Sequence, residues 1–471
     1  NGAIELVNSQ YDNYRSNIRP NWMQFSPRLG LAYQFAHNTV FHAGYGIFFL
    51  PNNVAWNYSP NNDPINGFTT PYTASVLTGL PASNISNPFP TGVQQYPGRN
   101  PIYQRLLIGQ GPTSAQLANP YGYAQQFNAD IQHQFGQSFL VDVAYAGSRG
   151  VHLPINGHQI DQLPDQYLSL GQQLTTNVPN PIAGIPVSGS LQAATVQAGQ
   201  LLRPFPQYNG VTFAGQGIGN STYNSLQVTA TKRFSGGNQI SVAYTHSKLI
   251  SDTDTVTGWL EAGGTGGYQD NNNLRLERSL ASFDTPDRVV VTYVLDVPVG
   301  KGRKFLSNSN GLVQAVLGGW AIQGTTTFQS GFPLHFGTST NNTHSFGGGS
   351  RPNVAAGCES NASGSATQRL AKWFDTGCFS APAPFTFGNE PRVDPKLRAQ
   401  GIDNTDFAAV KDFPFGSDGR YRIQFRSEFF NIFNRVQFGP PGQTQGNSNF
   451  GVVTSQYNNP RLIQFALRFG F

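Results

Sequence analysis

Two segments near the end of the sequence alternate strictly between apolar and polar side chains. In residues 420–429 one face carries Tyr421, Ile423, Phe425 and Phe429, and the other carries Arg420, Arg422, Gln424, Arg426 and Glu428. Residues 461–471 set Ile463, Phe465, Leu467, Phe469 and Phe471 against Leu462, Gln464, Ala466, Arg468 and Gly470. A period of two is that of a β-strand. A strand face with several charges cannot lie against a dry core without partners, but it can face water. Each segment therefore predicts a strand with one apolar and one wet face.

The same alternation predicts further strands upstream, most of them joined in hairpins. The predicted strands are 29–35 with 41–47, 127–135 with 139–145, 226–234 with 240–244, 289–297 with 320–328, then 420–429, a brief strand at 435–438, and 461–471. About ten residues at ~3.3 Å each, tilted near 45°, span a membrane. The pattern thus predicts an all-β chain, a transmembrane antiparallel β-barrel of about eleven visible strands.

The lengths of the connections predict how this barrel is oriented. Links within the hairpins are mostly a few residues, whereas residues 51–122, 149–221, 250–285 and 331–418 are long and rich in Gly, Pro, Asn and Ser. Outer-membrane barrels have short periplasmic turns and long extracellular loops. We therefore expect 331–418 to be a large extracellular loop. We also expect 420–429 to run inward, and the chain to end at the periplasmic rim.

The composition agrees with a membrane barrel and excludes other classes. Charged residues are 11% and aromatic residues 13%, against about a quarter charged in ordinary globular domains. The mean hydropathy of −0.33 is still slightly polar, as expected where lipid-facing and lumen-facing residues alternate. No apolar run reaches the roughly 18 residues of a membrane helix. A net charge of +5 without a basic stripe argues against a nucleic-acid partner.

An odd number of strands predicts that residues 1–471 are part of a larger barrel. Single-chain bacterial barrels have even strand numbers, and about eleven strands are half of a 22-strand transporter. The first residue is Asn, and no signal peptide is recognisable. We therefore expect a targeting segment, and further strands or domains, upstream of residue 1.

Cysteines and the C-terminus supply two site predictions. Cys358 and Cys378 are the only cysteines, both in one loop-like stretch, which predicts a loop-closing disulfide in an oxidising compartment; the alternative is two unpaired thiols. Phe471, with Phe469 and Leu467 at alternate positions, is typical of the C-terminal signal read by the barrel assembly machinery. The alternative is an ordinary apolar strand end.

Several motifs resemble those of TonB-dependent receptors, and most of all their Oar-like group. They are Phe25-Ser-Pro-Arg-Leu-Gly-Leu-Ala-Tyr33, Trp373-Phe-Asp-Thr-Gly-Cys-Phe-Ser-Ala-Pro382, Phe425-Arg-Ser-Glu-Phe-Phe-Asn-Ile-Phe-Asn-Arg435, Phe450-Gly451 and Asn459-Pro-Arg461 through Phe471. The resemblance implies uptake of a large or scarce substrate, energised through a plug domain and the TonB system. Neither a plug nor a TonB-box segment can be placed in these residues, so we expect both upstream.

Charged residues of the predicted strands and turns are the remaining candidates. Arg420, Arg422, Arg426 and Arg468 are predicted to face the lumen, where they contact a substrate or the plug, or form ion-pair ladders with other wall residues. The turn 298–304 holds three cations that either anchor the barrel at a phosphate-bearing membrane surface or are simply solvated. No catalytic motif, metal-ligand spacing or cofactor motif is recognisable.

Three other functions remain open at this stage. A passive porin or an adhesin-like outer-membrane protein predicts a barrel that closes within this chain. A secreted, soluble β-rich binding protein predicts that the Tyr421/Ile423/Phe425 face packs on a second sheet. An enzyme is the weakest alternative, because nothing in the sequence supports catalysis.

Overall fold

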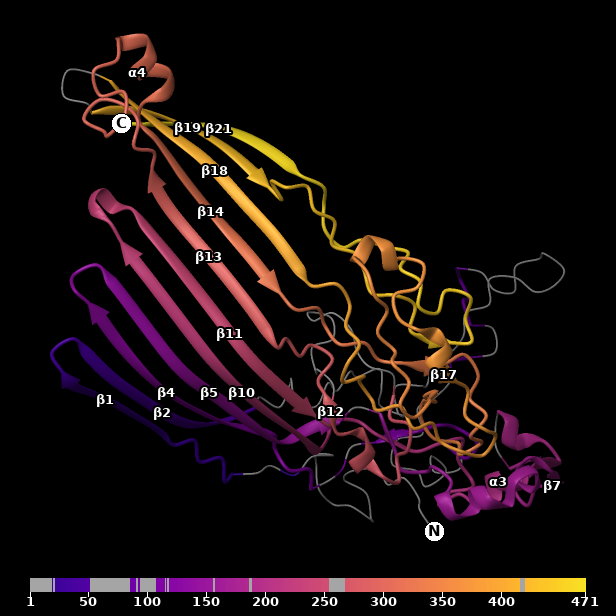
Figure 1. The fold of residues 1–471 in the computed structure, drawn as a ribbon. Coiled ribbons are helices and arrows are strands. Elements are labelled where there is room, and N and C mark those ends of the chain that lie inside the picture. Colours follow the sequence, from indigo (N-terminus) through magenta and orange to yellow (C-terminus); the bar gives the residue numbers. More distant parts are fainter. Residues whose placement is uncertain are drawn as a thin grey trace.

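The chain folds mainly into one large antiparallel sheet (Figure 1). The computed structural model describes residues 19, 22–50, 85–89, 92–93, 107–114, 116, 118–155, 157–185, 189–253, 267–415 and 420–471. The predicted outer loop 51–122 therefore lies largely outside the described residues.

Among the described residues, eleven long strands follow one another in the sheet in sequence order. They are β1 (Arg28–Ala36), β2 (Thr39–Phe49), β4 (Tyr123–Phe135), β5 (Phe139–Ile155), β10 (Gln216–Arg233), β11 (Gln239–Ser251), β13 (Asp287–Asp296), β14 (Trp320–Gln329), β18 (Ile402–Phe415), β19 (Tyr421–Phe430) and β21 (Leu462–Gly470). Every neighbouring pair of these strands is antiparallel. The short β12 (Ser279–Leu280) pairs with the end of β11. The sheet is thus a meander without crossovers, as predicted for a barrel wall.

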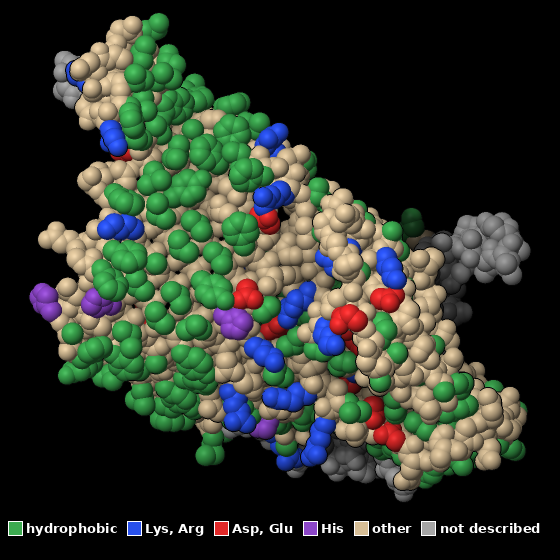
Figure 2. Space-filling model, in the orientation of Figure 1, with side chains coloured by type: hydrophobic (Ala, Val, Ile, Leu, Met, Phe, Trp, Pro, Cys, Tyr) green, Lys and Arg blue, Asp and Glu red, His purple; other side chains and the backbone are tan. Residues whose placement is uncertain are grey.

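One face of this sheet is apolar and exposed. Register places side chains of like character opposite one another, for example Phe425 opposite Leu467 and Ile423 opposite Phe469. Leu31, Phe465 and Leu467 are 56, 66 and 76% exposed. Figure 2 shows hydrophobic side chains spread over much of this face of the sheet, with few charged side chains among them. Soluble monomers do not expose apolar surface on this scale, so this face is the lipid-facing one.

Within the described residues, the apolar face of β19 does not pack on a second sheet. Tyr421 and Ile423 are 39 and 38% exposed. The aromatic partners of Tyr421 lie on the same sheet, Phe415 at 5.5 Å and Phe469 at 6.2 Å between ring centroids. The covering sheet that the soluble binding-protein alternative requires is therefore not found in the described part of the chain.

Short and long connections separate to opposite ends of the sheet, as predicted (Figure 1). The C-terminus lies at the end that carries the β1–β2, β4–β5 and β10–β11 turns. By the convention of outer-membrane barrels this end is periplasmic. β5 and β10, with 17 and 18 residues, are longer than a membrane requires and extend beyond it into the loops.

The sequence-based boundaries are wrong around β18. Residues 402–415, predicted as part of the loop 331–418, form a full strand that pairs with β14 and β19. Residues 435–438, predicted as a brief strand, are outside the sheet, and Phe438 makes only an isolated bridge with Gln456. The number of long strands stays at eleven because one error offsets the other. The extracellular loop therefore covers residues 330–401.

The added strand reverses the predicted direction of β19. Residues 421–430 follow the periplasmic connection after β18 and run outward, not inward. Residues 431–461 then form an extracellular loop instead of a periplasmic turn. β21 runs inward, so the predicted periplasmic position of the C-terminus is unchanged.

In the described part of the connections, the helices and strands are short. The short strands are β3 (Thr113–Ser114), β6 (His158–Gln159), β7 (Asn177–Pro179), β8 (Thr195–Gln197), β9 (Thr212–Phe213), β15 (Gly337–Thr338), β16 (Asn353–Val354), β17 (Phe379–Ser380) and β20 (Thr444–Gln445). The helices are α3 (Ala198–Leu201), α4 (Gly311–Leu317) and the 3-10 turns η3 (Asp165–Thr175), η4 (Ser190–Gln192), η5 (Ser235–Gly237), η6 (Leu274–Glu277), η7 (Ala366–Arg369) and η8 (Thr376–Cys378). None of the helices in the described part of the chain is long and apolar enough to cross a membrane.

Candidate functional site

The predicted lumen-facing arginines form a patch on the polar face of β19 and β21. Register sets Arg468 opposite Gln424, in the row between Arg422 and Arg426. Arg420 lies one residue before β19 and is exposed. The sheet therefore brings Arg422, Arg426 and Arg468 together on one face.

Acidic side chains partly neutralise this patch. Arg422 Nη1 lies 3.8 Å from Asp412 Oδ2, and Arg426 Nη2 lies 2.7 Å from Glu428 Oε1. All four side chains are at least one-fifth exposed. Ion pairs with this much exposure contribute little stability. Arg422 and Arg426 thus form ion pairs with other residues of the wall, and their remaining exposure leaves both guanidinium groups accessible to solvent.

The extracellular loops fold into a layer with its own hydrophobic core. Leu334, Phe336, Trp373, Phe374, Cys378, Phe379 and Leu397 form one buried cluster. Phe450, from the loop 431–461, packs against it, with its ring centroid 5.1 Å from that of Phe374. The Trp373 backbone N–H donates to Gly451 O at 2.8 Å. The motifs at 373–382 and 450–451 thus join two loops into one body.

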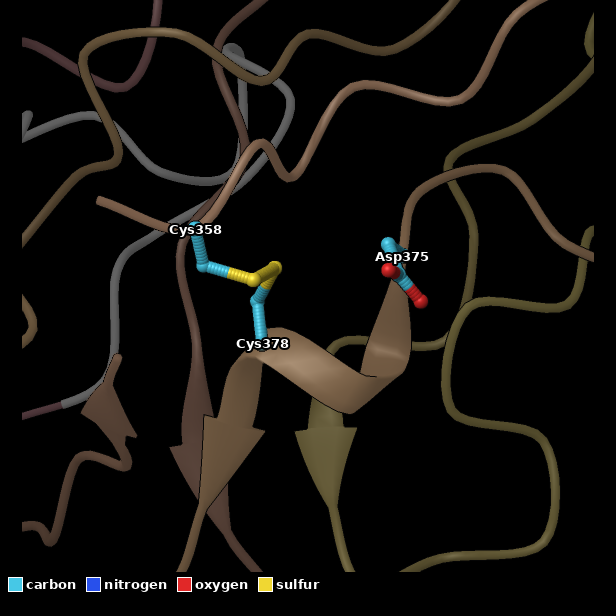
Figure 3. A group of neighbouring side chains, drawn as sticks. All are labelled: Cys358, Asp375 and Cys378. Atoms are coloured by element: carbon cyan, nitrogen blue, oxygen red, sulfur yellow. A yellow bond between two sulfur atoms is a disulfide. The ribbon is translucent and has the colours of Figure 1, made fainter. Parts of the chain in front are cut away.

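A disulfide closes part of this layer. Cys358 and Cys378 are bonded, with Cα atoms 5.7 Å apart (Figure 3). Together with Asp375 they are the single group of three or more His, Cys, Asp or Glu residues in the described part of the chain whose ligand atoms lie within 4.8 Å of one another. Both sulfurs are committed to the disulfide, and the Asp375 carboxylate pairs with Lys372 Nζ at 2.8 Å. This group therefore offers no thiolate to a metal ion.

Buried charges hold the loop layer onto the strand ends. Arg351 pairs with Glu277, and both side chains are nearly inaccessible. Arg392 donates to Glu277 O at 2.9 Å and to Ser251 O, at the end of β11, at 2.7 Å. Arg398 Nη2 lies 2.6 Å from Asp284 Oδ2. Residues 277–284 are thereby fixed between the sheet and the loop 330–401.

A second buried pair orders the loop that follows β5. Arg203 Nη2 lies 2.8 Å from Asp161 Oδ2, and neither side chain is more than 1% exposed. Burial raises the pKa of Asp161 to about 6, although Arg203 and the Phe205 N–H act in the opposite direction. Burial likewise lowers the pKa of Arg203. Sequence reasoning missed these buried pairs, because nothing in the loop sequence marks which charges become partners.

The turn after β19 explains the residues of the Phe425–Arg435 motif. Asn431 and Asn434 adopt positive φ angles of 51° and 50°, which Asn tolerates better than most residues. The Asn431 side chain accepts from the Arg435 N–H and donates to Arg435 O. Asn434 Oδ1 accepts from the Arg461 N–H at 2.9 Å. The asparagines thus fix the turn and the start of β21.

A cavity of about 770 Å³ adjoins this turn. Its lining includes Gln400, Asp406, Asn431, Gln437 and Asn458. Several of these polar side chains already form hydrogen bonds with the backbone. Gln400, for example, donates to Val436 O and accepts from the Phe438 N–H. Many of the polar side chains that line the cavity therefore bind the loop itself and are not free for a ligand.

Comparison with known proteins identifies the class. A family model described as "Outer membrane beta barrel domain" matches residues 1–464. The chain belongs to this family, and its location is the outer membrane. No curated protein matches it in sequence.

Several solved structures resemble the chain. The outer membrane transporter YddB from Escherichia coli is 8% identical, with a TM-score of 0.43 over 94% of this chain and 40% of its own. The FrpB iron transporter from Neisseria meningitidis is 13% identical, with a TM-score of 0.37 over 94% of this chain and 38% of its own. The pyoverdine outer membrane receptor FpvA from Pseudomonas aeruginosa is 10% identical, with a TM-score of 0.39 over 95% of this chain and 36% of its own. The chain thus spans two fifths or less of the length of these proteins.

Proposed function

We propose that this chain is part of the barrel of a TonB-dependent receptor of the Oar-like group, which takes up a substrate too large or too scarce for porins. The observation that carries the proposal is the open sheet. β1 and β21 each have one long-strand neighbour within the described part of the chain. An unpaired strand edge in lipid leaves backbone groups without hydrogen bonds. Eleven strands would form half of a 22-strand barrel of the transporter type.

Two further features support this function over that of a passive porin. The motifs at 25–33, 425–435 and 459–471 resemble TonB-dependent receptors. The extracellular loops form a packed layer with buried ion pairs, which is suited to selecting a ligand before it enters the barrel. In this proposal the Arg422/Arg426/Arg468 patch contacts the plug or the substrate from the lumen.

Photocrosslinking in the complete protein tests for the plug. A photoreactive residue at Gln424, on the lumen face, should crosslink within the same polypeptide to a segment upstream of residue 1, identified by mass spectrometry. The matched control is Phe425, the adjacent residue on the lipid face, which should not. A complete gene that encodes no upstream plug, or equal crosslinking from both positions, would overturn the proposal.

Conductance separates the receptor from the porin. A plugged receptor in a planar bilayer should show little steady conductance, and removal of the upstream plug should open it. A large, steady conductance of the complete protein would favour the passive porin instead.

A further inference from the structure

The connection between β13 and β14 carries an exposed apolar helix at the periplasmic rim (Figure 1). Residues 297–319 hold three cations, Lys301, Arg303 and Lys304, followed by α4, which contains no charged residue. The barrel function described above assigns no role to this segment.

Hydrogen bonds place α4 on the lipid side of the wall. Trp320 and Lys411 lie opposite each other in register, and Lys411 lies opposite Phe425, so all three project from the apolar face. Lys411 Nζ donates to Ala315 O at 2.5 Å, and Trp320 Nε1 donates to Val316 O at 2.8 Å. The last carbonyls of a helix lack partners within the helix, so these bonds cap α4. Because its partners project toward lipid, α4 does not lie over the lumen.

The outward side of α4 is apolar. Leu312, Val316 and Leu317 are 76, 57 and 50% exposed. Phe305 and Leu306, just before the helix, are 52 and 47% exposed. These side chains continue the lipid-facing surface of β14 and β18 beyond the strand ends.

The preceding turn adds positive charge at the same level. Lys301, Arg303 and Lys304 are all exposed. Arg303 pairs with Asp296 at 2.7 Å, and residues 297–319 contain no acidic side chain. Cations beside an exposed apolar helix match the interface of a bilayer, where acyl chains adjoin phosphate groups.

We propose that residues 298–317 form an interfacial anchor that binds phospholipid in the periplasmic leaflet of the outer membrane. Leu312, Val316 and Leu317 lie among the acyl chains. Lys301 and Lys304 contact headgroup phosphates. Lys411 and Trp320 hold α4 at this depth from the barrel side.

Fluorescence in reconstituted bilayers tests the position of α4. Both cysteines of residues 1–471 are in the disulfide. Leu312→Cys therefore gives these residues a single free thiol, which can carry an environment-sensitive dye. In vesicles of phosphatidylcholine, the dye should emit at shorter wavelength, and brominated acyl chains should quench it several-fold. Gln137→Cys, in the exposed β4–β5 turn at the same rim, is the control and should report water. Unquenched emission at 312 would overturn the anchor, whether the dye then reports water or a protein partner.

A charge variant tests the headgroup contact. With the dye at 312, replacing part of the phosphatidylcholine by phosphatidylglycerol should increase quenching. The substitutions Lys301→Gln and Lys304→Gln together should abolish that increase while leaving the yield of heat-modifiable barrel unchanged. An equal increase in the variant would show that the cations are merely solvated and would overturn the phosphate contact.

Discussion

Buried ion pairs distinguish the extracellular layer from the lumen face of the wall. On the lumen face, the Arg422 and Arg426 side chains are 56 and 36% exposed, and their ion pairs are screened by water. In the loop layer, Glu277 and Arg351 are almost completely enclosed. Removing one partner of such a pair leaves an uncompensated buried charge and costs about 3–5 kcal/mol. Charged residues are thus replaceable on the lumen face at little cost in stability, whereas in the loop layer they are needed for folding.

Glu277→Ala should unfold the loop layer locally without unfolding the sheet. The buried Arg351 guanidinium loses its counter-charge, whereas Lys372→Ala breaks only an exposed pair with Asp375 and is the control. Limited proteolysis on intact cells should cleave the Glu277→Ala loops at least ten times faster than those of the control. Equal cleavage of both variants would argue against a structural role for the pair.

Glu390 should make the stability of the loop layer depend on pH. Burial first, and the neighbouring Asp394 carboxylate second, raise its pKa from 4.5 to about 8, against the opposing effect of Arg351. The folded layer therefore keeps a proton that the unfolded chain releases. The stabilisation of the folded layer by protonated Glu390 is fully present below pH 4.5. It is lost as the pH rises through about 8.

Proteolysis of the loops across this range measures the effect. Wild-type loops should become more susceptible between about pH 5 and about pH 9. Glu390→Gln, which resembles the protonated acid, should flatten this dependence. A wild-type profile that is level, or that slopes the other way, would contradict the assignment to Glu390.

At the scale of elements, the sequence predicts a strand well where its two faces differ in polarity. β19 and β21 fulfil this condition, and the structure confirms both. β18 was not predicted, because its lipid-facing side includes Asp403 and Lys411 as well as Phe407 and Phe413. Arg435 pairs with Asp403, and Lys411 Nζ donates to the Ala315 carbonyl near the end of α4. These partners are distant in sequence, so no local pattern reveals them.

The predicted assembly signal belongs to the last strand. Phe469→Ala with Phe471→Ala should lower the yield of heat-modifiable barrel in the outer membrane several-fold. Phe469 also contacts Tyr421 and Phe415, so lost packing must be separated from a lost signal. Tyr421→Ala removes one of these contacts and leaves the C-terminus intact. If it reduces the yield as strongly as the terminal variant, packing and not recognition explains the effect.

At the scale of the whole molecule, the open sheet predicts which strands are neighbours. If further strands complete the barrel, the thiols of Leu31→Cys on β1 and Phe465→Cys on β21 should not form a disulfide in the assembled protein. The pair Phe425→Cys and Leu467→Cys, which face each other across β19 and β21, should crosslink readily and serves as the positive control. Crosslinking between β1 and β21 within one polypeptide would mean that the barrel closes within this chain.

The meander order has a consequence for how such a protein changes. Each long strand pairs with its neighbours in sequence, and the longest connections lie at the extracellular end of the sheet. Doubling the length of a flexible loop costs only about 0.6 kcal/mol in closure entropy. Insertions and deletions outside the cell therefore leave the register of the membrane wall untouched. Because the loops 330–401 and 431–461 share one hydrophobic core, new length is best accommodated in exposed loop segments outside that core.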